Sequence, residues 1–208
     1  MRTATCVERE SSSGLEIARL KRGSYDELFI TVTPVRGEPV AHLFDRAARA
    51  VLDRGAHVIA QEVFHFAEHR EPAVRRFESL IGPIHWPVTW MENGTGEPLL
   101  AGTCIHALCG MAVRTIERDG RSIACVYEDD YGEYLTVGDL RDPVVSHPVA
   151  DQARNVFADL IWVLGEAGMD FSNVVRTWFF NDEILSWYDT FNAVRTEFFQ
   201  RHGVFEGL

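Results

Sequence analysis

The sequence predicts a mixed α and β fold made of two copies of one strand–helix–strand–helix unit. Three observations support this prediction. The tripeptide Pro39-Val40-Ala41 recurs as Pro148-Val149-Ala150, and each copy opens a stretch whose apolar residues have helical spacing. Each stretch ends at a glycine, Gly55 or Gly168, as helices often do. A short run of β-branched and aromatic residues follows each glycine, and such a run favours a strand.

The elements of the first copy follow in chain order. Residues 28–32 predict a strand, and the next helix carries one apolar face, formed by Leu43, Phe44, Ala47, Ala48, Val51 and Leu52. Residues 57–64 predict a second strand. A second helix contains Ala73-Val74-Arg75 and closes near Gly82. Two sheet-like segments, residues 85–91 and 104–117, complete this copy.

The second copy repeats this order up to its second helix. Residues 134–137 predict a strand, and the helix after Pro148 has an apolar face formed by Ala153, Val156, Phe157, Leu160, Ile161 and Leu164. Residues 174–180 predict a buried strand, and Ala193-Val194-Arg195 lies in the last helix. No closing strands follow before Leu208. We expect either that the given chain is truncated or that a partner surface covers the open sheet.

Charge narrows the possible partners. The 208 residues include 20 Lys and Arg and 31 Asp and Glu, which gives a formal net charge of −11. Such a surface repels phosphate groups, so we expect no nucleic-acid partner and no membrane partner. The N-terminus lacks an apolar signal core, and four cysteines are too few for a disulfide scaffold. We therefore expect a soluble, cytoplasmic protein with reduced thiols.

Neither a metal site nor a cofactor site is predicted. Cys104 and Cys109 lie five residues apart, which places them on opposite faces of a strand. Cys104 and His106 share a face, but two ligands alone make a poor metal site. His65 and His69 would share a helix face, but they lie where a strand is predicted to end.

Two further motifs have structural interpretations. Gly94-Thr95-Gly96 lacks the third glycine and the following helix of a dinucleotide-binding loop. The acidic cluster Glu128-Asp129-Asp130, followed by Tyr131-Gly132, predicts a strand end in solvent. Adjacent carboxylates on a turn seldom form an acid–base pair, so we do not assign them a catalytic role.

The second copy resembles the RidA family, also called YjgF or endoribonuclease L-PSP. The resemblance runs in order through Tyr134-Leu135-Thr136-Val137-Gly138, Asp151-Gln152-Ala153-Arg154-Asn155, Gly165-Glu166-Ala167-Gly168, Val174-Val175-Arg176-Thr177 and Asn192-Ala193-Val194-Arg195-Thr196-Glu197-Phe198-Phe199. The first copy is a weaker match, mainly over residues 29–64. Two copies in one chain look like the tandem arrangement of chorismatases.

The resemblance implies a specific architecture. The fold would be α+β and chorismate-mutase-like, with two RidA-like units that each have a mainly antiparallel sheet backed by two helices. The N-terminal unit would span residues 1–122 and the C-terminal unit residues 123–208, without its closing strands. RidA proteins are homotrimers, so we expect a homo-oligomer, such as a trimer of two-unit chains.

The resemblance also implies a ligand and part of its site. RidA enzymes hydrolyse reactive enamines and imines, and an arginine of their pocket binds the substrate carboxylate through two hydrogen bonds. Thr136, Gly138 and Asn192 match pocket positions, and they imply that a small carboxylated metabolite binds there. This sequence has no match for that arginine. The corresponding position lies near Trp86 in the first copy and beyond Leu208 in the second. The position of the catalytic glutamate is absent too, so the catalytic residues are unknown.

Because the family's arginine and glutamate have no match in this sequence, three hypotheses for function remain. The protein is a hydrolase or deaminase of the 2-iminobutanoate/2-iminopropanoate type, a chorismatase-like hydrolase or lyase, or a non-catalytic member that binds a metabolite or serves a structural role. The charge of −11 disfavours ribonuclease activity, since RNA cleavage normally needs a basic binding surface.

Overall fold

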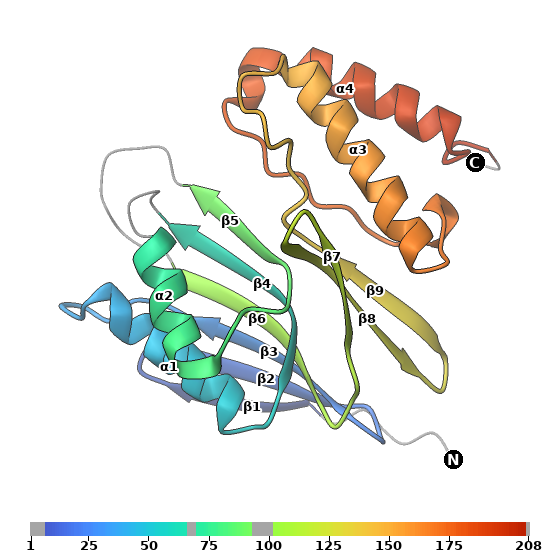
Figure 1. Ribbon diagram of the computed structural model, residues 1–208. Coiled ribbons are helices and arrows are strands. Elements are labelled where there is room, and N and C mark those ends of the chain that lie inside the picture. The colour runs from blue at the N-terminus through green and yellow to red at the C-terminus, as the bar shows by residue number, and fades with distance from the viewer. Residues whose placement is uncertain (1–6, 66–69, 93–101, 207–208) are drawn as a thin grey trace. The chain divides into compact units, whose positions relative to one another are not determined.

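The computed structural model describes residues 7–65, 70–92 and 102–206 (Figure 1). The chain divides into two compact units, residues 1–139 and residues 140–208. Both helices and a mainly antiparallel sheet are present, so the predicted α+β class is confirmed. The predicted boundary between residues 122 and 123 separates sequence copies and stays a prediction. In the described ranges, no helix has the length and apolar character that crossing a membrane requires.

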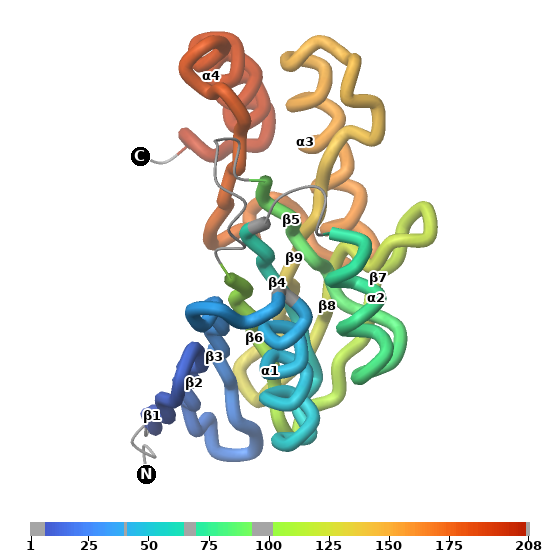
Figure 2. Tube along the Cα trace, turned by 90° about the vertical axis from the view of Figure 1, so that its left-hand side faces the viewer, coloured from blue at the N-terminus to red at the C-terminus, as the bar shows by residue number. Residues whose placement is uncertain are grey.

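The N-terminal unit contains a six-stranded sheet in the order β1-β2-β3-β6-β4-β5. Its strands are β1 (Val7–Ser12), β2 (Leu15–Lys21), β3 (Asp26–Val32), β4 (His57–His65), β5 (Val88–Glu92) and β6 (Gly102–Cys109). β4 and β5 are parallel, whereas the other neighbouring strands are antiparallel. Two helices, α1 (Val40–Leu52) and α2 (Arg70–Ile81), lie on the same side of this sheet (Figures 1 and 2).

The core of this unit follows the predicted apolar patterns. Six apolar residues of α1 are buried, namely Leu43, Phe44, Ala47, Ala48, Ala50 and Val51. Leu52, which was predicted on the same face, is 49% exposed at the end of the helix. In β3 the side chains alternate, so Leu28 and Ile30 are buried while Phe29 is 41% exposed. This alternation confirms the strand predicted over residues 28–32, and it places one face of β3 in the core.

A second, three-stranded sheet in the same unit has the order β7-β8-β9. Its strands are β7 (Arg114–Arg118), β8 (Arg121–Asp129) and β9 (Gly132–Val137). The single sheet-like segment predicted over residues 104–117 is therefore two strands. Gly110 ends β6 with a φ of 80°, a left-handed conformation that glycine adopts without steric cost. Cys125 and Tyr127 of β8 belong to the same buried cluster as the six-stranded sheet.

The C-terminal unit consists of α3 (Val149–Glu166), the 3₁₀ turn η2 (Phe171–Asn173) and α4 (Ile184–Arg201). α3 and α4 pack against each other (Figure 1). Aromatic rings form much of the contact between these elements. The ring of Phe157 stacks on that of Phe198 with centroids 4.2 Å apart, and Phe171 meets Phe198 edge-on at 5.0 Å.

The buried strand predicted over residues 174–180 is wrong. These residues form neither a helix nor a strand. Val175 is 99% exposed, Trp178 69% and Phe180 52%. A strand needs neighbouring strands to pair with. In the first copy the corresponding strand is β4, which pairs with β5 and β6, and both of these come after α2. In the described part of the chain, no strand follows α4 to pair with residues 174–180.

A buried carboxylate fixes the segment that leads into α3. Asp142 accepts hydrogen bonds from Val144 N–H at 2.9 Å, from His147 Nδ1 at 2.8 Å and from Asn155 Nδ2 at 2.7 Å. Its side chain is only 1% exposed. The hydrogen bond with His147, supported by those from Val144 and Asn155, lowers the pKa of Asp142 to about 2.

We expect Asp142 to make the C-terminal unit sensitive to acid. The pKa of this carboxyl is lower in the folded chain than its usual 3.8, so its ionised form stabilises the fold above about pH 4. That contribution is lost as the pH falls toward about 2. Thermal unfolding from pH 7 down to pH 2 checks this for the wild type and Asp142→Asn. The substitution should lower the midpoint at pH 7, and the difference should shrink at low pH. The exposed Asp189→Asn is the control, and a pH-independent difference for Asp142→Asn would contradict the prediction.

Candidate functional site

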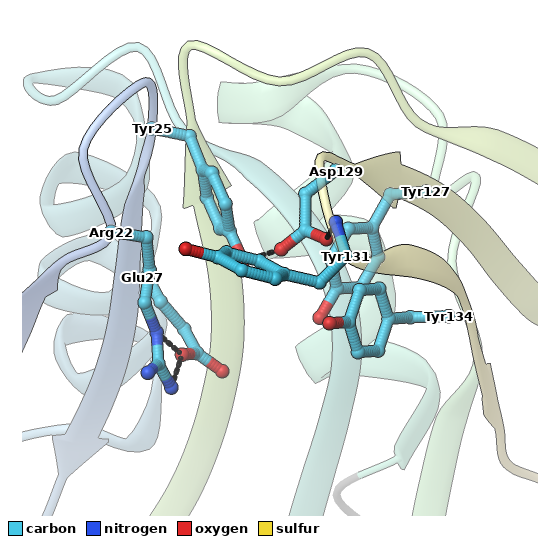
Figure 3. Close-up of a pocket in the computed structure, with 7 residues that line it drawn as sticks. All are labelled: Arg22, Tyr25, Glu27, Tyr127, Asp129, Tyr131 and Tyr134. Carbon is cyan, nitrogen blue, oxygen red and sulfur yellow. Dashed lines mark hydrogen bonds and ion pairs between the residues drawn. The ribbon is translucent and has the colours of Figure 1, made fainter. Parts of the chain in front are cut away.

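A cavity of about 350 Å³ opens in the N-terminal unit where β3 approaches the β8–β9 hairpin. We call it the tyrosine cavity. It is lined by tyrosines and charged groups, namely Arg22, Tyr25, Glu27, Tyr127, Asp129, Tyr131 and Tyr134 (Figure 3). The volume is within the range of small-molecule sites. The lining combines four phenol groups with two carboxylates and one guanidinium.

The β8–β9 turn positions one wall of this cavity. The Asp129 carboxylate accepts the N–H groups of Tyr131 at 2.8 Å and Gly132 at 3.2 Å, so it closes the turn. Tyr127 and Tyr134 are directly opposite in the antiparallel ladder. Their rings stack with centroids 4.9 Å apart. The acidic cluster thus ends a strand, as predicted, but it also contributes to a cavity, which the sequence analysis missed.

Glu27 forms the centre of an ionic cluster on the opposite wall. It is 7% exposed, and its Oε2 accepts hydrogen bonds from Arg22 Nε at 2.9 Å and Nη2 at 2.6 Å. His106 Nε2 lies 2.8 Å from Oε1 of the same carboxylate. The hydrogen bond with His106 lowers the pKa of Glu27, burial opposes this, and Arg22 lowers it further. Glu27 is therefore ionised at neutral pH, and Arg22 balances its charge.

Tyr25 joins the two walls. Its hydroxyl donates to Asp129 Oδ2 at 3.1 Å, and its ring meets that of Tyr127 edge-on at 6.3 Å. Burial raises the pKa of Tyr25 well above its usual range, and the bond to Asp129 raises it further. Burial also raises the pKa of Tyr127 to about 12. Both phenols are neutral at pH 7, so they can donate hydrogen bonds or present their ring faces.

Asp129 remains charged although burial opposes its ionisation. Hydrogen bonds from Tyr131 N–H, the Tyr25 hydroxyl and Gly132 N–H outweigh the effect of burial and lower the pKa of this carboxyl. The cavity therefore holds two carboxylates and one guanidinium at neutral pH. Because these carboxyl groups have low pKa values, they are poorly suited to donate a proton near pH 7.

Two of the predicted ligand-binding residues, Thr136 and Gly138, lie at the end of β9 in the N-terminal unit. Thr136 pairs with Cys125 in the ladder, and Gly138 N–H donates to Ile123 O at 3.0 Å. A Cβ atom at Gly138 would lie 3.1 Å from both Pro87 Cβ and Thr89 Oγ1. Glycine therefore permits a close approach at this point. Neither Thr136 nor Gly138 lines the tyrosine cavity.

The third predicted residue, Asn192, lies in α4 of the C-terminal unit. Its Oδ1 atom is buried, and no group in the described chain donates a hydrogen bond to it. A buried acceptor without a donor costs about 1–3 kcal/mol. A ligand hydroxyl or amine would satisfy this atom. Since Thr136 and Gly138 belong to the other unit, a shared pocket for the three residues stays a prediction.

Trp86 occupies the place where the RidA resemblance puts the signature arginine in the first copy. It is 8% exposed, and its Nε1 donates to Gln61 Oε1 at 3.1 Å. Gln61 Nε2 in turn donates to Thr103 Oγ1 at 3.1 Å. This position is therefore filled by a hydrogen-bonded core side chain, which cannot bind a carboxylate as a guanidinium does.

Metal ligation has no candidate in the described part of the chain. No group of three or more His, Cys, Asp or Glu side chains there could hold a metal ion. Cys104 contacts the Thr31 hydroxyl, and burial raises the pKa of its thiol. The side chains of His65 and His69 lie outside the described residues.

Comparisons with known proteins agree with the resemblance found in the sequence. Residues 136–205 match the family described as Endoribonuclease L-PSP, which confirms the RidA resemblance over those residues. The crystal structure of a chorismatase has the same fold, with a TM-score of 0.64 and 15% sequence identity. The match covers 92% of this chain and 71% of the chorismatase chain. No curated protein has significant similarity to the chain.

Proposed function

We propose that this chain binds a small carboxylated metabolite and acts on it as a chorismatase-like hydrolase or lyase. The extent of the chorismatase match carries this proposal. It covers 92% of the chain, so a single superposition includes both sequence copies. This is expected if the chain has the tandem arrangement of chorismatases. A sequence identity of 15% does not identify the substrate, so the substrate must be found by experiment. Chorismate is the first compound to test.

The proposed ligand site lies in the second copy. Thr136, Gly138 and Asn192 all fall within residues 136–205, the segment that matches the family. The unpartnered Oδ1 of Asn192 supports a ligand that carries a donor group such as a hydroxyl or amine, and the resemblance to RidA proteins supports the carboxylate. Chorismate has both a hydroxyl and carboxylates. The proposal takes the chain as two RidA-like units that assemble into a homo-oligomer, as the resemblance implies.

Imine deamination is the second candidate, and the family match favours it. Trp86 is buried where the first copy would need a guanidinium, so that copy lacks the group with which the family binds a substrate carboxylate, whichever candidate is correct. The chorismatase-like activity ranks first because the chorismatase match covers 92% of the chain, whereas the family match covers residues 136–205. Ribonuclease activity is not proposed despite the family description. The net charge of −11 would repel the RNA backbone.

Two assays separate these candidates. Either hydrolysis or elimination at the enol ether of chorismate releases pyruvate. We therefore expect the chorismate absorbance to fall and pyruvate to appear, both in proportion to protein concentration. In the second assay the chain is added to an amino-acid dehydratase, and release of ammonia and keto acid is followed. Acceleration there, together with unchanged chorismate, would replace this proposal with imine deamination. If both assays are negative but small carboxylates raise the unfolding temperature, the chain is a binding protein without turnover.

A further inference from the structure

The tyrosine cavity of the N-terminal unit has more negative than positive charge. Glu27 and Asp129 are both ionised, and Arg22 is the one cation among the lining residues. Two guanidinium nitrogens of Arg22 bond to Glu27, so this positive charge is already balanced inside the protein. The charge that remains is that of Asp129. A carboxylated ligand would therefore meet repulsion here, whereas a cation would be attracted.

Four tyrosine side chains line the cavity that contains this charge. Tyr127 and Tyr134 stack on each other, and Tyr25 stands edge-on to Tyr127. Tyr131 projects from the turn and is 90% exposed, and Figure 3 shows its ring reaching from the hairpin toward the side of Arg22 and Glu27. A cation held over the face of such a ring is attracted by the negative charge density of the ring, which raises affinity by about twofold to thirtyfold depending on how far the cation is desolvated.

We propose that this cavity binds a small organic ammonium ion, with the tyrosine rings around the cation and Asp129 as its counter-charge. The cavity volume of about 350 Å³ suits a ligand of that size. The net charge of the whole chain, −11, would raise the local concentration of cations. This inference goes beyond the proposed function, because neither Thr136 nor Gly138 lines the cavity and Asn192 belongs to the other unit.

Titration of the full chain with tetramethylammonium chloride or choline chloride tests this proposal. Binding is followed by NMR at pH 7.5 and low salt, with sodium benzoate as the anionic probe. We expect saturable binding of both cations and no saturable binding of benzoate at this site. Tyr131→Ala should raise the dissociation constant for tetramethylammonium about fivefold, because it removes one ring. Asp129→Asn should raise it about tenfold, since a neutral amide replaces the charge in a partly desolvated site.

Tyr188→Ala is the matched control, because Tyr188 is 52% exposed and lies in the C-terminal unit. It should bind tetramethylammonium as the wild type does. Tyr131 is too exposed for its removal to affect folding, so that variant remains informative even if Asp129→Asn unfolds. The proposal is overturned if the wild type shows no saturable cation binding, if Tyr131→Ala binds like Tyr188→Ala, or if benzoate displaces tetramethylammonium from this cavity and binds there more tightly.

Discussion

Phe77→Ala is expected to lower the free energy of unfolding of the N-terminal unit by about 3–5 kcal/mol. Phe77 is 2% exposed. Its ring meets Phe44 edge-on at 6.2 Å and Trp86 at 6.0 Å, so it joins α2 to α1 and to the segment before β5. The substitution would leave a cavity among these rings and lose two aromatic pairs, each worth about 0.5–1.5 kcal/mol.

Urea unfolding followed by circular dichroism measures this effect. Leu80→Ala is the control on the same helix, since Leu80 is 37% exposed and its truncation should cost less than about 1 kcal/mol. Phe77→Leu keeps most of the apolar volume and should fall between the two. If Phe77→Ala and Leu80→Ala lowered the stability equally, α2 would not pack on the sheet through Phe77.

Asn192→Ala is expected to weaken ligand binding about tenfold or more while leaving the stability of the free chain unchanged or higher. The two effects differ in direction because Asn192 Oδ1 is buried without a donor in the free chain. Removing it relieves that cost, but it also removes the acceptor that a ligand would use. Such a trade between stability and binding is typical of functional residues.

Thermal unfolding with and without chorismate measures both effects at once. Gln200→Ala, an exposed position on α4, should respond to chorismate as the wild type does. A purely structural asparagine would show the opposite pattern, with a less stable free chain and an unchanged response to the ligand. That pattern would place the ligand site away from Asn192.

Helical periodicity made α1 and α3 predictable from the sequence. Their apolar residues recur at three- and four-residue spacing, and each helix is followed by a glycine with positive φ, Gly55 or Gly168. β1 could not be found in the same way. All six of its residues are exposed, so its sequence has no apolar alternation to show. The run 174–180 has the composition of a strand, but composition cannot supply a pairing partner.

The tyrosine cavity could not be predicted from the sequence, because it depends on contacts between residues that lie far apart in the chain. Tyr127 and Tyr134 are brought together by the register of the β8–β9 hairpin, whose turn is closed by the Asp129 carboxylate. The hydrogen bond between Tyr25 and Asp129 joins residues 104 positions apart, and no local pattern indicates it. Glu27 is a charged residue next to the apolar residues of β3, and its burial becomes understandable only once Arg22 and His106 are seen beside it.

Calorimetric titration of chorismate into the wild-type chain measures whether the chain binds a small carboxylated metabolite, as proposed. We expect saturable binding that Asn192→Ala weakens about tenfold or more and Gln200→Ala leaves intact. Binding heats no larger than those of dilution, at chorismate concentrations that saturate a millimolar site, would contradict it.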